Sequence, residues 1–81
     1  MTTSTKELSK GSYPATVCRA LGWTVGTRIR GNEGRGETVI ELTAIGQKRI
    51  LAKVISHNGE PRNDPHEATW TLAKREWELV A

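Results

Sequence analysis

The sequence predicts a single, mainly β domain with one short helix near its N-terminus. Its 81 residues give room for one hydrophobic core. The apolar spacing of a helix occurs only briefly, before Gly22. From Val25 onward, short stretches rich in Val, Ile, Leu and Thr alternate with turns rich in Gly, Asn and Pro, which is typical of β-strands. Residues 1–12 are polar and predict a flexible tail, so the domain is expected over residues 13–81.

The helix is predicted over about residues 14–21. Pro14 suits the first turn of a helix, because the N–H group that proline lacks would have no partner there. Apolar residues then recur up to Leu21, and Gly22 is a typical C-terminal cap. A helix this short is not stable alone, so we expect it to pack on the rest of the domain.

Five strands are expected after the helix. Their predicted ranges are 27–30, 38–44, 49–56, 68–72 and 77–80. Gly46 supplies the backbone freedom for a turn between the second and third strands. Residues 31–36 predict a glycine-rich loop, residues 57–67 a run of turns, and residues 73–76 one helical turn.

Alternation of apolar and polar residues assigns one face of the strands to the core. The predicted core positions are Ile29, Ile40, Leu42, Ala44, Ile50, Ala52, Val54, Trp70 and Leu72. Val39, Leu51 and Ile55 would point away from that core and form an apolar strip, which needs a cover. We expect the N-terminal helix, with Leu21 and Trp23, to cover it, and a dimer interface is the alternative.

Composition excludes several classes of protein. The single cysteine, Cys18, cannot form an internal disulfide and suits a reducing compartment. No stretch approaches the roughly 20 apolar residues that span a bilayer, and the N-terminus lacks the apolar region of a signal peptide. We therefore expect a cytoplasmic protein without a membrane partner. The net charge of +3 and the pI near 9.4 describe a small basic domain.

Sites for chemistry are weakly supported. The glycines of residues 31–36 suggest a phosphate loop, but no Lys-Ser/Thr pair follows them, so a flexible loop is expected. Four residues could be drawn together as metal ligands: His57, Asp64, His66 and Glu67. Their spacing matches no metal motif, and exposed turns are the better interpretation. Without a general base or paired carboxylates, we expect no enzyme activity, no cofactor and no metal.

Basic residues give the best lead toward nucleic acid. The basic set is Arg28, Arg30, Arg35, Arg49, Lys53, Arg62, Lys74 and Arg75, of which the first five are the nucleic-acid candidates. Arg28 and Arg30 alternate outward on the first strand and Arg35 follows in the loop, so three guanidinium groups can share one edge. Under the other interpretation, these cations pair with Glu33, Glu37, Glu41, Glu76 and Glu78 on a solvated surface. Such pairs contribute only about 0–1 kcal/mol each.

The order of elements resembles that of the SH3-like small barrels: strand, glycine-rich loop, long hairpin, strand, one helical turn and strand. The resemblance covers roughly residues 25–80. It implies a small five-stranded SH3-like barrel behind the N-terminal helix. Exposed aromatic residues are too few for a proline-peptide groove or a methyl-lysine cage.

Five stretches are also similar to a family of small bacteriophage and prophage proteins of uncharacterised function. They are Val25-Gly26-Thr27-Arg28, Thr38-Val39-Ile40-Glu41, Ile50-Leu51-Ala52-Lys53, Ser56-His57-Asn58-Gly59, and Trp70-Thr71-Leu72 with Trp77. The similarity implies a product made in the cytoplasm of an infected bacterium that acts on host factors. It transfers no catalytic residue.

We therefore expect a non-enzymatic, phage-encoded binding module that binds a host protein. The candidate contact residues are Val39, Leu51 and Ile55 of the apolar strip, with Asn32 and Glu33 at the loop tip. The alternative is a nucleic-acid-binding barrel that uses the arginine-rich edge, with affinity that falls steeply as salt rises. A virion or assembly component that forms a homo-oligomer is a third class.

Overall fold

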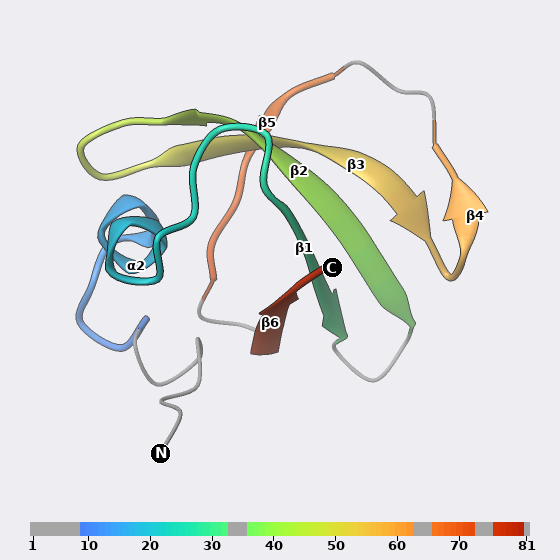
Figure 1. Cartoon of the computed structure of the whole chain (residues 1–81), viewed down its shortest axis with the longest axis horizontal. Helices are drawn as coiled ribbons and strands as arrows, with labels where there is room; N and C mark the ends of the chain where they lie inside the picture. Colours follow the sequence, from blue (N-terminus) through green and yellow to red (C-terminus); the bar gives the residue numbers. More distant parts are fainter. Residues whose placement is uncertain (1–8, 33–35, 63–65, 73–75, 81) are drawn as a thin grey trace.

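The computed structural model describes residues 9–32, 36–62, 66–72 and 76–80 (Figure 1). In these residues one helix, α2 (Pro14–Ala20), precedes the strands. The strands are β1 (Arg28–Asn32), β2 (Glu37–Ile45), β3 (Ile50–His57), β4 (Glu60–Pro61), β5 (Ala68–Thr69) and β6 (Glu76–Leu79). The mainly β class with one short helix before the sheet is confirmed. None of the helical residues described forms a stretch long and apolar enough to cross a membrane.

All strands belong to one antiparallel sheet. Its order is β4-β3-β2-β1-β6, and β5 also pairs with β3. The long hairpin of β2 and β3 forms the spine, with β1 and β6 on one side and β4 and β5 on the other (Figure 1). In the described ranges no strand pairing joins β6 to β4 or β5, so the sheet is open and not closed into a barrel.

Strand β4 is not among the five predicted strands, because the sequence predicts only turns there. Asn58 and Gly59 both have positive φ angles, 53° and 81°, and connect β3 to β4 as a two-residue turn. Asn-Gly is the pair that favours this turn, because both positions require the left-handed region. Pro61 ends β4 at the edge of the sheet, where a missing N–H group costs no hydrogen bond. The predicted helical turn lies mostly outside the described residues, and Glu76 already belongs to β6.

The C-terminus of α2 has the cap that Gly22 predicts. Gly22 has a φ of +74°, and its N–H donates to the carbonyl of Arg19 at 3.2 Å. The N–H of Trp23 donates to the carbonyl of Cys18 at 2.8 Å. These two bonds are those of a Schellman motif, which ends the helix and turns the chain toward β1. Trp23 is buried in the core as a result.

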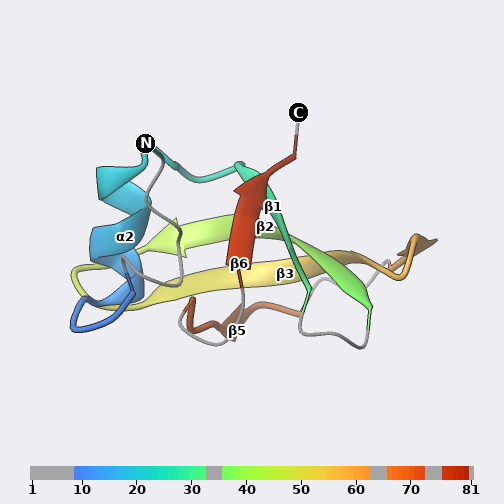
Figure 2. The same cartoon turned by 90° about the horizontal axis from the view of Figure 1, so that it is seen from below.

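The helix packs on the core, which corrects the expectation that it covers the apolar strip. Its buried residues Ala15, Val17 and Cys18 belong to the same hydrophobic cluster as the inner residues of the sheet. Trp23 belongs to this cluster, and Leu21 packs against it. Figures 1 and 2 show α2 beside the turn that joins β2 and β3. The two sides are tied there by a hydrogen bond of 3.2 Å from the Ala15 N–H to the Lys48 carbonyl.

Most of the predicted core is confirmed. The fully buried members are Ile29, Ile40, Leu42, Ile50, Ala52 and Leu72. Val54 and Trp70 are partly buried and pack against this cluster. The cluster gains α2, Trp23 and Trp77, which alternation within the strands did not assign to it.

The prediction for Ala44 is wrong because β2 contains a β-bulge. Leu42 and Ala44 pair with the consecutive residues 52 and 51 of β3, so Thr43 is an extra residue on β2. An extra residue shifts the alternation of faces by one position. The core therefore takes Ile45 in place of Ala44.

A second irregularity lies in β3. Val39 pairs with Ser56 and Ile40 pairs with Val54, so Ile55 is the extra residue there. Regular alternation would place Ile55 directly opposite Val39. The extra residue prevents this pairing, and Val39 lies opposite Ser56. The two bulges interrupt the regular pattern on which the apolar strip was predicted.

Candidate functional site

The sheet has a core face and an opposite face, which we call the outer face. Residues directly opposite each other in antiparallel strands lie on the same face. Alternation from the buried Ile29 and Ile40 therefore places two cross-strand rows on the outer face. They are Arg28, Glu41 and Lys53, and next to them Glu78, Arg30, Val39 and Ser56. Three nucleic-acid candidates and one protein-contact candidate thus lie on one surface.

The basic residues of this surface are ion-paired. Glu41 accepts a hydrogen bond from Arg28 Nε at 3.0 Å, and its second oxygen lies 3.5 Å from Lys53 Nζ. Arg30 Nε donates to Glu78 Oε1 at 2.6 Å. The hydrogen bond from Arg28 and the nearby charge of Lys53 lower the pKa of Glu41 below its usual value. Glu41 therefore stays ionised and offsets the charge of both neighbours at neutral pH.

The apolar candidates do not form one continuous strip. Val39 and Leu51 are both half-buried, but the row that contains Glu41 lies between them. Leu51 is paired with Ala44 on one side and with Thr69 of β5 on the other. Ile55 is half-buried at the second bulge. The outer face thus carries separate apolar positions with an ionic row between them.

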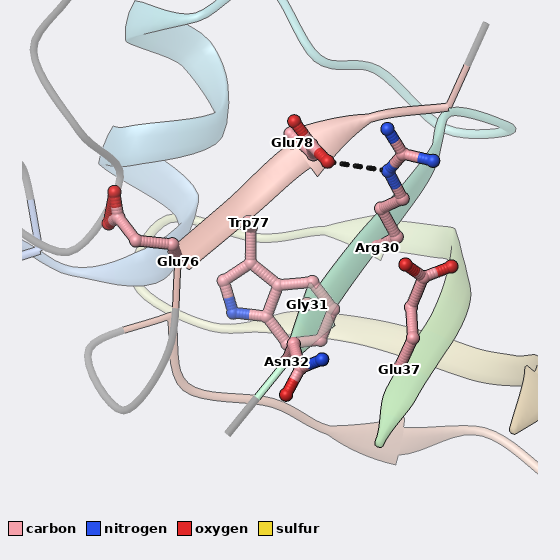
Figure 3. Close-up of a pocket in the computed structure, with 7 residues that line it drawn as sticks. All are labelled: Arg30, Gly31, Asn32, Glu37, Glu76, Trp77 and Glu78. Carbon is pink, nitrogen blue, oxygen red and sulfur yellow. Dashed lines mark hydrogen bonds and ion pairs between the residues drawn. The ribbon is translucent and has the colours of Figure 1, made fainter. Parts of the chain in front are cut away.

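A cleft opens beside β1 and β6 (Figure 3). Its volume is about 300 Å³, and its lining residues are Arg30, Gly31, Asn32, Glu37, Glu76, Trp77 and Glu78. The lining contains three carboxylates and one guanidinium, and that guanidinium is the one paired with Glu78. Asn32, a predicted protein contact, lies in this cleft, whereas Glu33 and Arg35 lie outside the described residues.

Gly36, which immediately precedes β2, lies against the Asn58 side chain. Its φ is +131°, and a Cβ placed there would lie 1.8 Å from Asn58 Oδ1. Asn58 is held by two bonds to Glu37: the Glu37 N–H donates to Asn58 Oδ1 at 3.0 Å, and the Asn58 N–H donates to the Glu37 carbonyl at 2.7 Å. The Asn58 side chain thus occupies the space that only a glycine leaves free.

A second cleft lies on the core side of the sheet, near the end of β3. Its volume is about 240 Å³, and it is lined by Thr38, Val54, His57, Arg62 and Trp70. Thr38 Oγ1 and His57 Nδ1 are hydrogen-bonded at 2.9 Å. Trp70 meets Trp77 edge to face, with ring centroids 5.9 Å apart. Sequence reasoning missed this cleft, although Trp70 and the Asn58-Gly59 turn were its visible signals.

Arg49 is separated from the other nucleic-acid candidates that the structure describes, Arg28, Arg30 and Lys53. It is exposed and immediately precedes β3, at the turn beside α2. Arg28, Arg30 and Lys53 lie farther along the sheet on the paired rows. The arginine edge therefore contains at most Arg28 and Arg30 among the described candidates, with Lys53 next to them across β2.

The remaining chemical candidates are not assembled into a site. Among the residues described, no group of three His, Cys, Asp or Glu side chains could hold a metal ion. His66 and Glu67 are exposed, and Asp64 lies outside the described ranges. Burial raises the pKa of the Cys18 thiol to about 11, although Arg19 acts in the opposite direction. A buried, protonated thiol is a poor nucleophile.

Comparison with known proteins gives a family but no activity. No curated protein and no solved structure matches the chain. A family model matches residues 12–81, which comprise the helix and the whole sheet. The family is described as a domain of unknown function, DUF7241, and the chain belongs to it.

Proposed function

We propose that this domain is a non-enzymatic binding module, encoded by a bacteriophage or prophage, that binds a host protein in the bacterial cytoplasm. One observation carries the proposal. Because α2 packs on the core face, the outer face of β1, β2 and β3 keeps half-buried apolar residues beside ion pairs. A surface that mixes apolar and polar groups in this way is typical of non-obligate protein interfaces.

The ion pairs favour a protein partner over nucleic acid. Arg28 and Lys53 share Glu41, and Arg30 is paired with Glu78. Phosphate groups would have to compete with these carboxylates for the same cations. Three carboxylates line the adjacent cleft and would repel a polyanion. The similarity to small phage proteins supports a host protein as the partner.

The test uses lysine substitutions on the outer face. Val39→Lys and Leu51→Lys each place a charge at a half-buried apolar position, and Thr16→Lys places the same charge on the exposed side of α2. Tagged variants are used to retain partners from the lysate of a bacterial host, in halves with and without nuclease. We expect the native chain to retain the same protein in both halves. At least one outer-face variant should lose about tenfold in affinity, which corresponds to about 1.4 kcal/mol, and Thr16→Lys should lose none.

Thermal unfolding of each variant shows whether binding is lost because the surface has changed or because the variant no longer folds. Retention that disappears with nuclease would favour the nucleic-acid alternative. Unchanged retention by both outer-face variants, with unchanged stability, would remove the outer face as the binding surface.

A further inference from the structure

The cleft on the core side contains one cation, Arg62, among the described residues that line it. Arg62 lines this cleft, and its backbone N–H donates to the Ile55 carbonyl at 2.8 Å, which fixes the base of the side chain. Within the described part of the chain, its guanidinium has no hydrogen bond or ion pair. This distinguishes it from Arg28 and Arg30, which are paired with glutamates. A guanidinium fork without a partner is available to an anion from outside.

His57 offers a second polar group to the same cleft. Its Nδ1 is hydrogen-bonded to Thr38 Oγ1 at 2.9 Å, which orients the ring. Its Nε2 has no hydrogen-bond partner among the residues that the structure describes. An imidazole N–H can donate to a carboxylate beside an arginine. The cleft thus combines a full positive charge with an oriented imidazole.

The rest of the lining is apolar. Trp70 is half-buried, and its ring is fixed edge to face against the buried Trp77. Val54 packs against the core and lies in the same cleft. An occupant therefore meets apolar side chains as well as a guanidinium and an imidazole. The volume of about 240 Å³ suits one or two amino-acid side chains rather than a folded segment.

We propose that this cleft binds a glutamate or aspartate side chain of a protein partner, carried in a short peptide segment beside an apolar residue. The carboxylate would lie against Arg62 and His57, and the apolar side chain against Trp70 and Val54. Arginine suits carboxylates because its planar fork can donate two parallel bonds. A nucleic acid strand is disfavoured, because its binding depends on several cations, and the described lining of this cleft holds one, Arg62.

This site lies on the other side of the sheet from Val39, so it does not depend on the outer-face proposal. The probe is the peptide acetyl-Leu-Glu-Leu-amide, titrated into the full chain labelled with ¹⁵N and followed by the indole N–H signals of the three tryptophans. We expect the Trp70 signal to shift saturably, with a Kd of roughly 1 mM for so small a ligand. The matched peptide acetyl-Leu-Gln-Leu-amide should bind about tenfold more weakly, because it lacks the charge.

Two matched variants test the role of Arg62. Arg62→Gln removes the cation from the cleft, and Arg49→Gln removes an exposed cation beside the turn next to α2. Both are surface changes, and a dispersed spectrum verifies that each variant folds. We expect Arg62→Gln to lose about tenfold in affinity for the glutamate peptide, which is the size of one charge-assisted hydrogen bond. Arg49→Gln should bind as the native chain does.

Three results would overturn the proposal. The first is the absence of a saturable Trp70 shift at millimolar peptide, and the second is equal binding of the glutamate and glutamine peptides. The third is a shift of the same signals by an eight-residue oligothymidylate when the peptide produces none, which would assign the cleft to nucleic acid.

Discussion

The two ends of the β2–β3 hairpin are closed by different means. At the end that carries the turn between β2 and β3, α2 packs its apolar side onto the core and binds the turn through its backbone. At the other end, the contacts between β2 and β3 are polar: Asn58 bonds to Glu37, and His57 bonds to Thr38. The cleft that Arg62 and Trp70 line lies at this end of the hairpin.

The two ends of the hairpin differ in how much they contribute to stability. Apolar burial supplies most of the free energy that holds a small domain together, whereas net contributions of individual hydrogen bonds are small. The end beside α2 therefore contributes most to the stability of the domain, and substitutions of buried residues there should lower the free energy of unfolding most. The opposite end holds its geometry with a few polar contacts and keeps its cleft accessible.

The largest expected effect is at the end beside α2. Ile50 is fully buried, so Ile50→Ala should lower the free energy of unfolding by about 2–5 kcal/mol. Val54 is only half-buried toward the other end, and Val54→Ala should cost less than about 2 kcal/mol. Urea unfolding followed by tryptophan fluorescence measures both. Equal costs would show that the two ends do not differ in this way.

An intermediate effect is expected where Gly36 meets Asn58. Gly36→Ala should cost about 1–3 kcal/mol, because it adds both backbone strain and a collision with the Asn58 side chain. Gly59→Ala is the matched control, since Gly59 has a positive φ but open space around it. We expect Gly36→Ala to cost more than Gly59→Ala in the same urea unfolding experiment.

The collision can be isolated with a double-mutant cycle. Asn58→Gly removes the obstructing side chain and keeps a residue that tolerates the φ of 53° at that position. Gly36→Ala should therefore cost less in the Asn58→Gly background than in the native chain. Additive costs would mean that backbone strain alone accounts for the effect.

The smallest effect is expected in the ionic row between the two ends. The pKa of Glu41 is lowered in the folded protein, chiefly by the hydrogen bond from Arg28. Its stabilisation is therefore present above the usual pKa near 4.5 and is lost as the pH falls through the lowered value. Glu41→Gln should lower the free energy of unfolding by no more than about 1 kcal/mol at pH 7. It should have no effect at a pH below the lowered pKa of Glu41, where this carboxyl is protonated in the native chain as well.

The measurement is the free energy of unfolding of the native chain and of the Glu41→Gln variant, from pH 7 down to a pH below the lowered pKa of Glu41. A difference that stays constant with pH would mean that Glu41 contributes through packing. Glu37→Gln is a control on the same strand, at an exposed position.

The elements of the fold were largely predictable from local pattern. The predicted ranges for β2 and β3 agree with the structure to within one residue at each end, because alternation over eight or nine residues is a strong signal. The cap at Gly22 was predictable for the same local reason. β4 was missed because Pro61 argues against a strand unless the strand is known to lie at an edge.

The candidate sites were less predictable, because they depend on register. Regular alternation places Ala44 in the core, and only the pairing with Leu51 reveals the extra residue Thr43. Likewise, the ion pair between Arg30 and Glu78 joins residues that are 48 positions apart in the chain. The cleft beside Arg62 requires β3, β4 and the segment with Trp70 to be placed together, which no local pattern encodes.

The two bulges also bear on how the length of this chain can vary. If Thr43 were deleted, the residues on either side would fall into regular register with β3, and every other side chain would keep its face. The same holds for Ile55 against β2. A deletion elsewhere inside these strands would exchange the two faces beyond it. We therefore expect family members that are one residue shorter in these strands to lack a residue at one of these two positions.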